Sequence, residues 1–154
     1  MKWKETGHSS EALALTKSSA SPNSMDTFSL PFELTNGNTG RGHQWFRSAK
    51  LRKQFEAGIR AMGLARKPYD VPCNVTVTRV LGKGQRLWDS SSIGRGNYKE
   101  LEDALVACGW FVDDSPRHIT RTLFRQDESR REEGPFTEIQ VTPSGQASLI
   151  KEGV

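Results

Sequence analysis

The apolar residues of this chain change their spacing from every second position to every third or fourth. Every second residue of 27–34 is apolar, which predicts a half-buried strand, and Pro31 places that strand at a sheet edge. Between Gln44 and Leu64 the apolar residues recur at helical spacing, which predicts an amphipathic helix. β-Branched residues then alternate over 71–81, which predicts a second strand. This succession indicates helices packed on a sheet.

The remaining segments extend the same pattern. A long glycine-rich loop is expected over 82–96, followed by a helix over 97–108 with Asn97 as its N-cap and Gly109 as its stop. Three short strands are expected after it, at 110–112, 119–125 and 136–142. We therefore predict an α+β fold, with a mixed or antiparallel sheet and two main helices packed on one face of it.

The length of 154 residues and the hydrophobic content of 34% support one domain. We expect that domain at 25–143, between a flexible tail at 1–24, which is rich in Ser, Thr and Ala, and a short tail at 144–154. No apolar run approaches the roughly 20 residues that cross a bilayer. The start of the chain also lacks the apolar segment of a signal peptide, so a cytoplasmic protein without membrane contact is expected.

Cys73 and Cys108 are the only cysteines, and neither lies in a CxxC pair or beside a histidine at ligand spacing. The sequence therefore indicates neither a disulfide framework nor a zinc site, and a reducing compartment fits these residues best.

Charged residues are distributed unevenly, although the formal net charge is only +4. Residues 41–67 include eight basic side chains and one acid, whereas residues 100–114 include five acids and no base. One surface is expected to attract nucleic-acid phosphates and another to attract cations. The candidate phosphate contacts are Arg41, Arg47, Lys50, Lys53 and Arg60. The alternative is that these residues form an ordinary solvated surface.

Two adjacent carboxylates, Asp113 and Asp114, follow the apolar segment 110–112 directly. Like charges this close raise each other's pKa unless a cation neutralises them. Mg²⁺ takes oxygen ligands, usually one or two carboxylates with water and phosphate oxygens, so the pair is a candidate metal site. Lys99 and Asp103 lie four residues apart and share a helical face just before it. The alternative is a simple turn, because Asp-Asp-Ser-Pro is common turn chemistry.

The pattern of a lysine followed by D-A-L-x-x-x-G-x-x-x-D-D resembles the RusA family of Holliday-junction resolvases, which includes many phage-encoded members. The resemblance is close over 99–114 and looser over 26–142. It implies a homodimeric endonuclease that uses Mg²⁺, with Mn²⁺ as a substitute, to cut branched DNA during recombination and repair. It implies no small-molecule cofactor.

Carried over residue by residue, the resemblance makes Lys99, Asp113 and Asp114 catalytic and gives Asp103 a supporting role. The family also has an Asp-x-Asp-Asn segment before the lysine, and its nearest counterpart here is Asp89-Ser-Ser-Ser. Asp89 is therefore the fourth candidate catalytic residue, and the third candidate metal ligand beside Asp113 and Asp114.

Three functions remain open from the sequence. The first is a RusA-like nuclease in which a metal activates water and Lys99 stabilises charge on the phosphate. The second is a DNA-binding dimer without catalysis, because Ser91 and Ser92 stand where the family has Asp and Asn and a serine is no charged metal ligand. The third is a protein that uses the fold for protein contacts alone.

Overall fold

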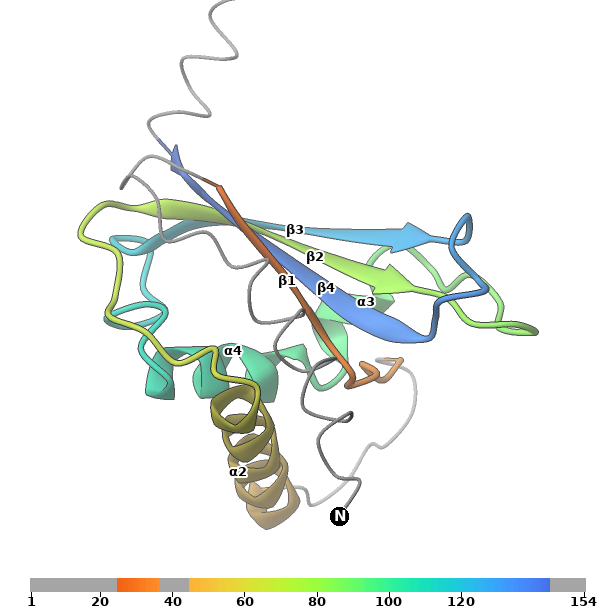
Figure 1. Cartoon of the computed structure of the whole chain (residues 1–154), viewed down its shortest axis with the longest axis horizontal. Coiled ribbons are helices and arrows are strands. Elements are labelled where there is room, and N and C mark those ends of the chain that lie inside the picture. The colour runs from red at the N-terminus through yellow and green to blue at the C-terminus, as the bar shows by residue number, and fades with distance from the viewer. Residues whose placement is uncertain (1–24, 37–44, 145–154) are drawn as a thin grey trace, which may run out of the picture.

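Four strands form one mixed sheet in the order β1-β4-β2-β3. The fold is that of a computed structural model, which describes residues 25–36 and 45–144. The strands are β1 (Asp26–Leu30), β2 (Cys73–Val80), β3 (Ile119–Asp127) and β4 (Phe136–Pro143). β4 is antiparallel to both of its neighbours, β1 and β2, whereas β2 and β3 are parallel. The chain between β2 and β3 therefore crosses over the sheet and carries two of the helices (Figure 1).

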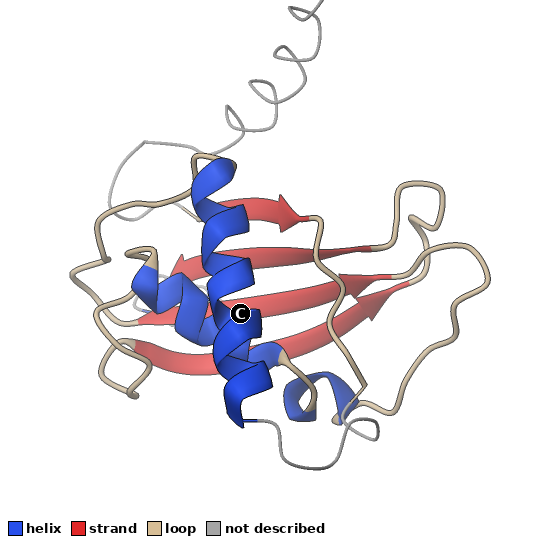
Figure 2. Ribbon diagram, turned by 90° about the horizontal axis from the view of Figure 1, so that it is seen from below, coloured by secondary structure: helices blue, strands red, loops and turns tan. Residues whose placement is uncertain are grey.

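The helices are α2 (Trp45–Ala61), α3 (Ser92–Arg95) and α4 (Tyr98–Ala107). They lie on one face of the sheet, with α2 crossing under the strands and α4 beside it (Figures 1 and 2). Alternate residues of the central strands, such as Val75 and Val77 of β2, are buried against them. The predicted α+β class, with helices on one face of a mixed sheet, is confirmed.

The best-buried aromatic residue lies where helix α4 ends. Trp110 is completely buried, and its indole N–H donates a hydrogen bond to the Leu64 carbonyl at 2.8 Å. Its ring centroid lies 4.4 Å from that of Phe28, and the Arg66 guanidinium lies 5.0 Å from the indole ring. A buried tryptophan stabilises strongly when its polar N–H is satisfied. Trp110 therefore fixes the end of α4 against the segment that follows α2.

The expected strand at 110–112 is not formed. The backbone amide of Trp110 donates to Leu105 O at 2.9 Å, and the Cys108 carbonyl accepts from Arg66 N at 3.0 Å. These groups complete the end of α4 and its contact with the chain after α2, so they are not available to pair with a strand. Trp110 and Phe111 of this apolar run are buried without belonging to the sheet, and Val112 is exposed.

Other boundaries differ in smaller ways. β1 ends at Leu30, and Pro31 follows it; the strand lies at the sheet edge, as predicted. Within the glycine-rich loop the short helix α3 forms. Asn97 makes no side-chain cap, because its Oδ1 accepts instead from the Thr35 amide at 2.8 Å. The expected tails lie outside the described residues, except for Ser144.

Both cysteines are free and buried, as the absence of a disulfide framework predicts. Among the described helices, none has the length and apolar character needed to cross a membrane.

Gly109, the predicted stop of α4, is needed for two reasons. Its φ is +95°, a backbone conformation that side chains disfavour, and a Cβ there would lie 1.7 Å from the Arg66 carbonyl oxygen. Gly63 has a similar φ of +73°, but a Cβ there meets nothing within 4 Å. Both glycines have a positive φ, but only at Gly109 does a neighbouring backbone atom leave no room for a Cβ.

We therefore expect Gly63→Ala to lower the free energy of unfolding by about 1–2 kcal/mol, the usual cost of left-handed backbone. Gly109→Ala should cost clearly more, because the Arg66 backbone must also move. Urea unfolding of both variants measures the difference. Equal losses would contradict the tight contact between Gly109 and Arg66.

Candidate nucleic-acid interface and acidic cluster

Three carboxylates surround one ammonium group on helix α4 and the loop that follows it. Lys99 Nζ lies 3.0 Å from Asp103 and 3.5 Å from Glu102, and it also donates to Asp114. The hydrogen bond to Asp114, followed by the contact with Asp103, raises the pKa of Lys99 above its ordinary value. Lys99 is therefore a fixed positive charge at the centre of these residues, which we call the acidic cluster.

Glu102 is the most buried carboxylate of this cluster. Burial raises the pKa of the Glu102 carboxyl, Lys99 opposes that rise, and the charges of Asp114 and Asp103 add to it. The rise shows that one lysine does not fully offset the burial and the neighbouring negative charges.

Asp113 and Asp114 point to different partners, although they are adjacent in sequence. Asp113 accepts a hydrogen bond from the Ser115 amide at 2.8 Å, and its Oδ1 lies 3.9 Å from His118 Nε2. Hydrogen bonds from Ser115 lower the pKa of Asp113. Asp114 instead pairs with Lys99. The repulsion expected between the two aspartates is thus relieved by groups of the protein itself.

Asp103, Asp113 and Asp114 border one open hollow of about 450 Å³ between the later halves of α2 and α4, which we call the acidic hollow. Its other lining residues are Arg52, Glu56, Val106 and Ala107. Asp89 is not among the residues that line it. Of the three expected metal ligands, two therefore share a surface.

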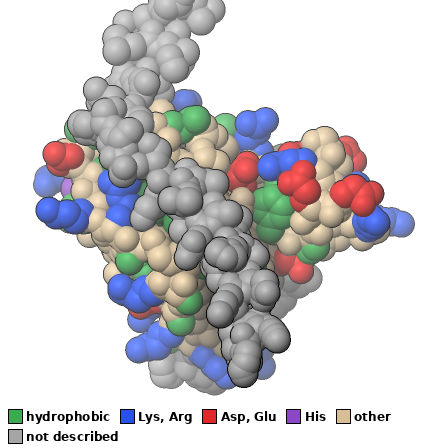
Figure 3. Space-filling view, viewed as in Figure 1, with side chains coloured by type: hydrophobic (Ala, Val, Ile, Leu, Met, Phe, Trp, Pro, Cys, Tyr) green, Lys and Arg blue, Asp and Glu red, His purple; other side chains and the backbone are tan. Residues whose placement is uncertain are grey.

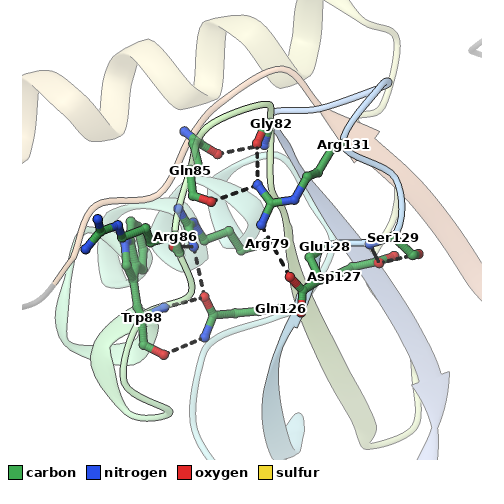
Figure 4. Close-up of polar contacts among 10 residues, drawn as sticks. All are labelled: Arg79, Gly82, Gln85, Arg86, Trp88, Gln126, Asp127, Glu128, Ser129 and Arg131. Carbon is green, nitrogen blue, oxygen red and sulfur yellow. Dashed lines mark hydrogen bonds and ion pairs between the residues drawn. The ribbon is translucent and has the colours of Figure 1, made fainter.

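Asp89 is placed by the residue before it. Gln126 of β3 bonds both the amide and the carbonyl of Trp88, each at 2.9 Å. Arg79 is buried, stacks on the Trp88 ring at 3.6 Å and donates to Gln126 Oε1 at 2.8 Å (Figure 4). The Asp89 carbonyl then accepts from the Ser92 amide at 2.9 Å. These contacts tie Asp89 to the end of β3 and the start of α3.

The Lys99 ammonium competes with any divalent metal for the carboxylates of the acidic cluster. Within residues 25–36 and 45–144, no three His, Cys, Asp or Glu side chains are grouped as metal ligands. The Lys99 ammonium already lies among Asp103, Asp114 and Glu102, and a dication placed beside it meets a like charge at short range. The Mg²⁺ or Mn²⁺ site stays a prediction from the resemblance.

Helix α2 presents the basic residues that the sequence singled out. Arg47, Lys50, Lys53 and Arg60 are all exposed, whereas Arg41 lies outside the described residues. Figure 3 shows Lys and Arg side chains over the lower part of the molecule, where α2 lies. Arg60 also donates to the Ala107 carbonyl at 2.9 Å, so it supports the C-terminal end of α4.

Sequence reasoning missed two charged residues near these sites. Glu102 joins the acidic cluster because it lies three residues after Lys99, a helical spacing that could have identified it. Arg95 lines a second hollow, beside Arg47 and Lys50 of α2. No spacing rule connects Arg95 to α2, because the two come together only through the packing of α2 against α4.

No protein-family model matches the chain, and no curated protein matches it. The function proposed below therefore rests on the sequence pattern and the geometry.

Replacing Lys99 tests whether its charge stands in for a metal. Lys99→Met leaves Glu102, Asp103 and Asp114 without their shared cation, so we expect a loss of at most about 1 kcal/mol, the range of exposed ion pairs. Added Mg²⁺ or Mn²⁺ should raise the melting temperature of this variant more than that of the wild type, because a divalent cation relieves the unbalanced carboxylates.

Lys53→Met is the matched control, since it removes one exposed lysine from a surface without a carboxylate cluster and should show no metal response. Thermal melting with and without millimolar metal gives the comparison. A large rise in the wild type itself would show that the carboxylates bind a metal despite Lys99.

Proposed function

We propose that this domain binds branched DNA through helix α2 and does not hydrolyse it. The observation that carries the proposal is the charge of α2, which has five basic residues and one acid, Glu56. Glu56 pairs with Arg52 at 3.5 Å, so the acid neutralises a residue outside the candidate set. Arg47, Lys50 and Lys53 make no ion pair with any described residue and remain available to a polyanion.

Contacts of this kind favour the DNA backbone over the bases. Lysine and arginine on an exposed helix neutralise phosphates and release counterions, which gives affinity that depends on salt and little on sequence. Lys50 and Lys53 lie three residues apart and therefore on neighbouring positions of one helix face. This supports a surface that follows a phosphate backbone.

The lack of hydrolysis in the proposal follows from the acidic cluster. Lys99 is engaged by Asp114 and Asp103, and its ammonium competes with a divalent metal for these carboxylates. The choice of branched DNA, and a homodimer as the binding unit, come from the resemblance to the RusA family. The exposed basic residues of α2 support the DNA-binding part of the proposal independently of that resemblance.

The double substitution Lys50→Ala with Lys53→Ala should weaken binding to a four-way junction by a similar factor for every sequence. On duplex arms, removing one phosphate contact lowers the slope of log K against log salt by about 0.9, so removing two lowers it by about 1.8. Fluorescence anisotropy at several salt concentrations measures this slope.

Lys83→Ala is the matched control, because Lys83 is an exposed lysine on the loop after β2 that pairs with Glu132 at 3.2 Å. This variant removes one lysine charge from the loop after β2 and none from α2, so it should leave the slope of log K against log salt unchanged. An unchanged slope in the double variant would place the DNA on another surface, and no affinity even at low salt would favour protein contacts alone.

The nuclease remains a second candidate because one observation favours it. Lys99, Asp103 and Asp114, which the resemblance aligns with functional positions, converge within ion-pair distance. In this alternative the acidic hollow faces the scissile phosphate, and a lysine beside it stabilises developing charge.

A cleavage assay separates the two candidates. Purified full-length protein is incubated with a labelled four-way junction and Mg²⁺ or Mn²⁺, with Asp114→Asn as the reference. We expect intact junction in both reactions and retained binding by both proteins. Metal-dependent nicks that vanish in Asp114→Asn would establish the nuclease and exclude the binding module.

A further inference from the structure

A second open hollow lies between the first half of α2 and the turn that joins α3 to α4. Its volume is about 570 Å³, and we call it the basic groove. It is lined by Thr35, Arg47, Ser48, Lys50, Leu51, Gln54, Arg95, Gly96, Asn97 and Glu100. Three cations and one carboxylate therefore border the same space.

The cations of the groove are not neutralised. Arg47, Lys50 and Arg95 are exposed, and none of them has an ion-pair partner among the described residues. Glu100 reduces the net charge of the lining to +2, counting three cations against one acid. Convergent basic side chains around a hollow attract anions and form charge-assisted hydrogen bonds to phosphate oxygens.

The wall opposite α2 is held by close backbone contacts. A Cβ at Gly96 would lie 1.8 Å from the Thr35 carbonyl oxygen, so glycine lets the turn approach the segment after β1. The adjacent Asn97 accepts a hydrogen bond from the Thr35 amide at 2.8 Å. Arg95 directly precedes this fixed turn. Its backbone is therefore already held in place, which lowers the conformational entropy lost when a ligand binds.

The size of the groove limits what it can hold. Its volume lies within the range of about 300–1,000 Å³ typical of pockets that enclose one small ligand, which is too little for a duplex. It suits two nucleotides of a separated strand together with the three phosphates that flank them. The lining also offers the exposed amide group of Gln54, and the bases of a single strand expose edges that accept such a contact.

We propose that the basic groove binds the phosphates of a single DNA strand, with Arg95 as a contact supplied from outside helix α2. The proposal rests on the proposed function and deepens it, since a branch point offers both duplex arms and separated strands. Duplex arms contact the exposed face of α2 that includes Lys53, and one unpaired strand enters the groove beside it. Lys50 borders both the face and the groove, so it contacts whichever DNA is bound there.

The test uses a fluorescein-labelled oligothymidylate and a blunt duplex of equal length with full-length protein. Three phosphate contacts predict a slope of log K against log salt of about −2.1 on the single strand, at about 0.7 per contact. Arg95→Ala should flatten that slope by about 0.7. It should also weaken oligothymidylate binding about tenfold, the loss expected for one charge-assisted hydrogen bond. Duplex affinity should not change.

Arg86→Ala is the matched control, because Arg86 is an exposed arginine on the loop after β2 whose backbone carbonyl, and not its side chain, accepts a hydrogen bond from Arg79. It should leave both affinities unchanged. Arg95→Lys, which keeps the charge, should retain most of the single-strand affinity. Circular dichroism establishes that each variant is folded.

The outcomes separate this inference from the proposed function. If folded Arg95→Ala binds oligothymidylate as the wild type does, while Lys53→Ala weakens junction binding, the inference is wrong and the function stands. If the wild type binds neither oligothymidylate nor a four-way junction at low salt, both are wrong. Displacement of oligothymidylate by thymidine monophosphate at equal phosphate concentration would show a mononucleotide site and overturn the strand assignment.

Discussion

The burial of Trp110 determines how helix α4 lies beside helix α2, and both hollows depend on that arrangement. The indole bonds to Leu64 just after α2, and Gly109 passes against Arg66 where no side chain fits. Together these contacts bring the later half of α4 next to the later half of α2, where Arg60 reaches the Ala107 carbonyl. The hollows are therefore set by the core and not by the charged residues that line them.

The seam between the two helices has opposite charge at its two ends. The basic groove lies at the beginnings of α2 and α4, and the acidic hollow lies at their later halves. A phosphate backbone is attracted to the first and repelled from the second unless a cation intervenes. Arg52 lines the acidic hollow and pairs with Glu56, and Lys99 pairs with Asp114 and Asp103 at its border. The seam therefore places a surface that attracts anions beside one that attracts cations.

Local pattern was sufficient to predict the fold class, the edge position of β1 and the two main helices, because each depends on the spacing of apolar residues. The sequence could not reveal that 110–112 forms no strand, since the amide of Trp110 bonds to the end of α4. The sequence predicted that Asp113 and Asp114 act as a pair. In the structure Asp113 bonds to Ser115, whereas Asp114 pairs with Lys99. Such outcomes depend on tertiary contacts that spacing does not encode.

Position 92 links the sequence pattern to the proposed loss of catalysis. Ser91 and Ser92 stand where the resemblance places Asp and Asn; Ser92 is completely buried, and its hydroxyl has no hydrogen-bond partner among the described residues. A buried polar group without a hydrogen bond is costly, so position 92 accepts the small serine hydroxyl at some cost to stability. Arg95, one helical turn later, adds a cation to the basic groove. The short helix α3 therefore holds a buried serine at its start and an exposed arginine of the basic groove at its end.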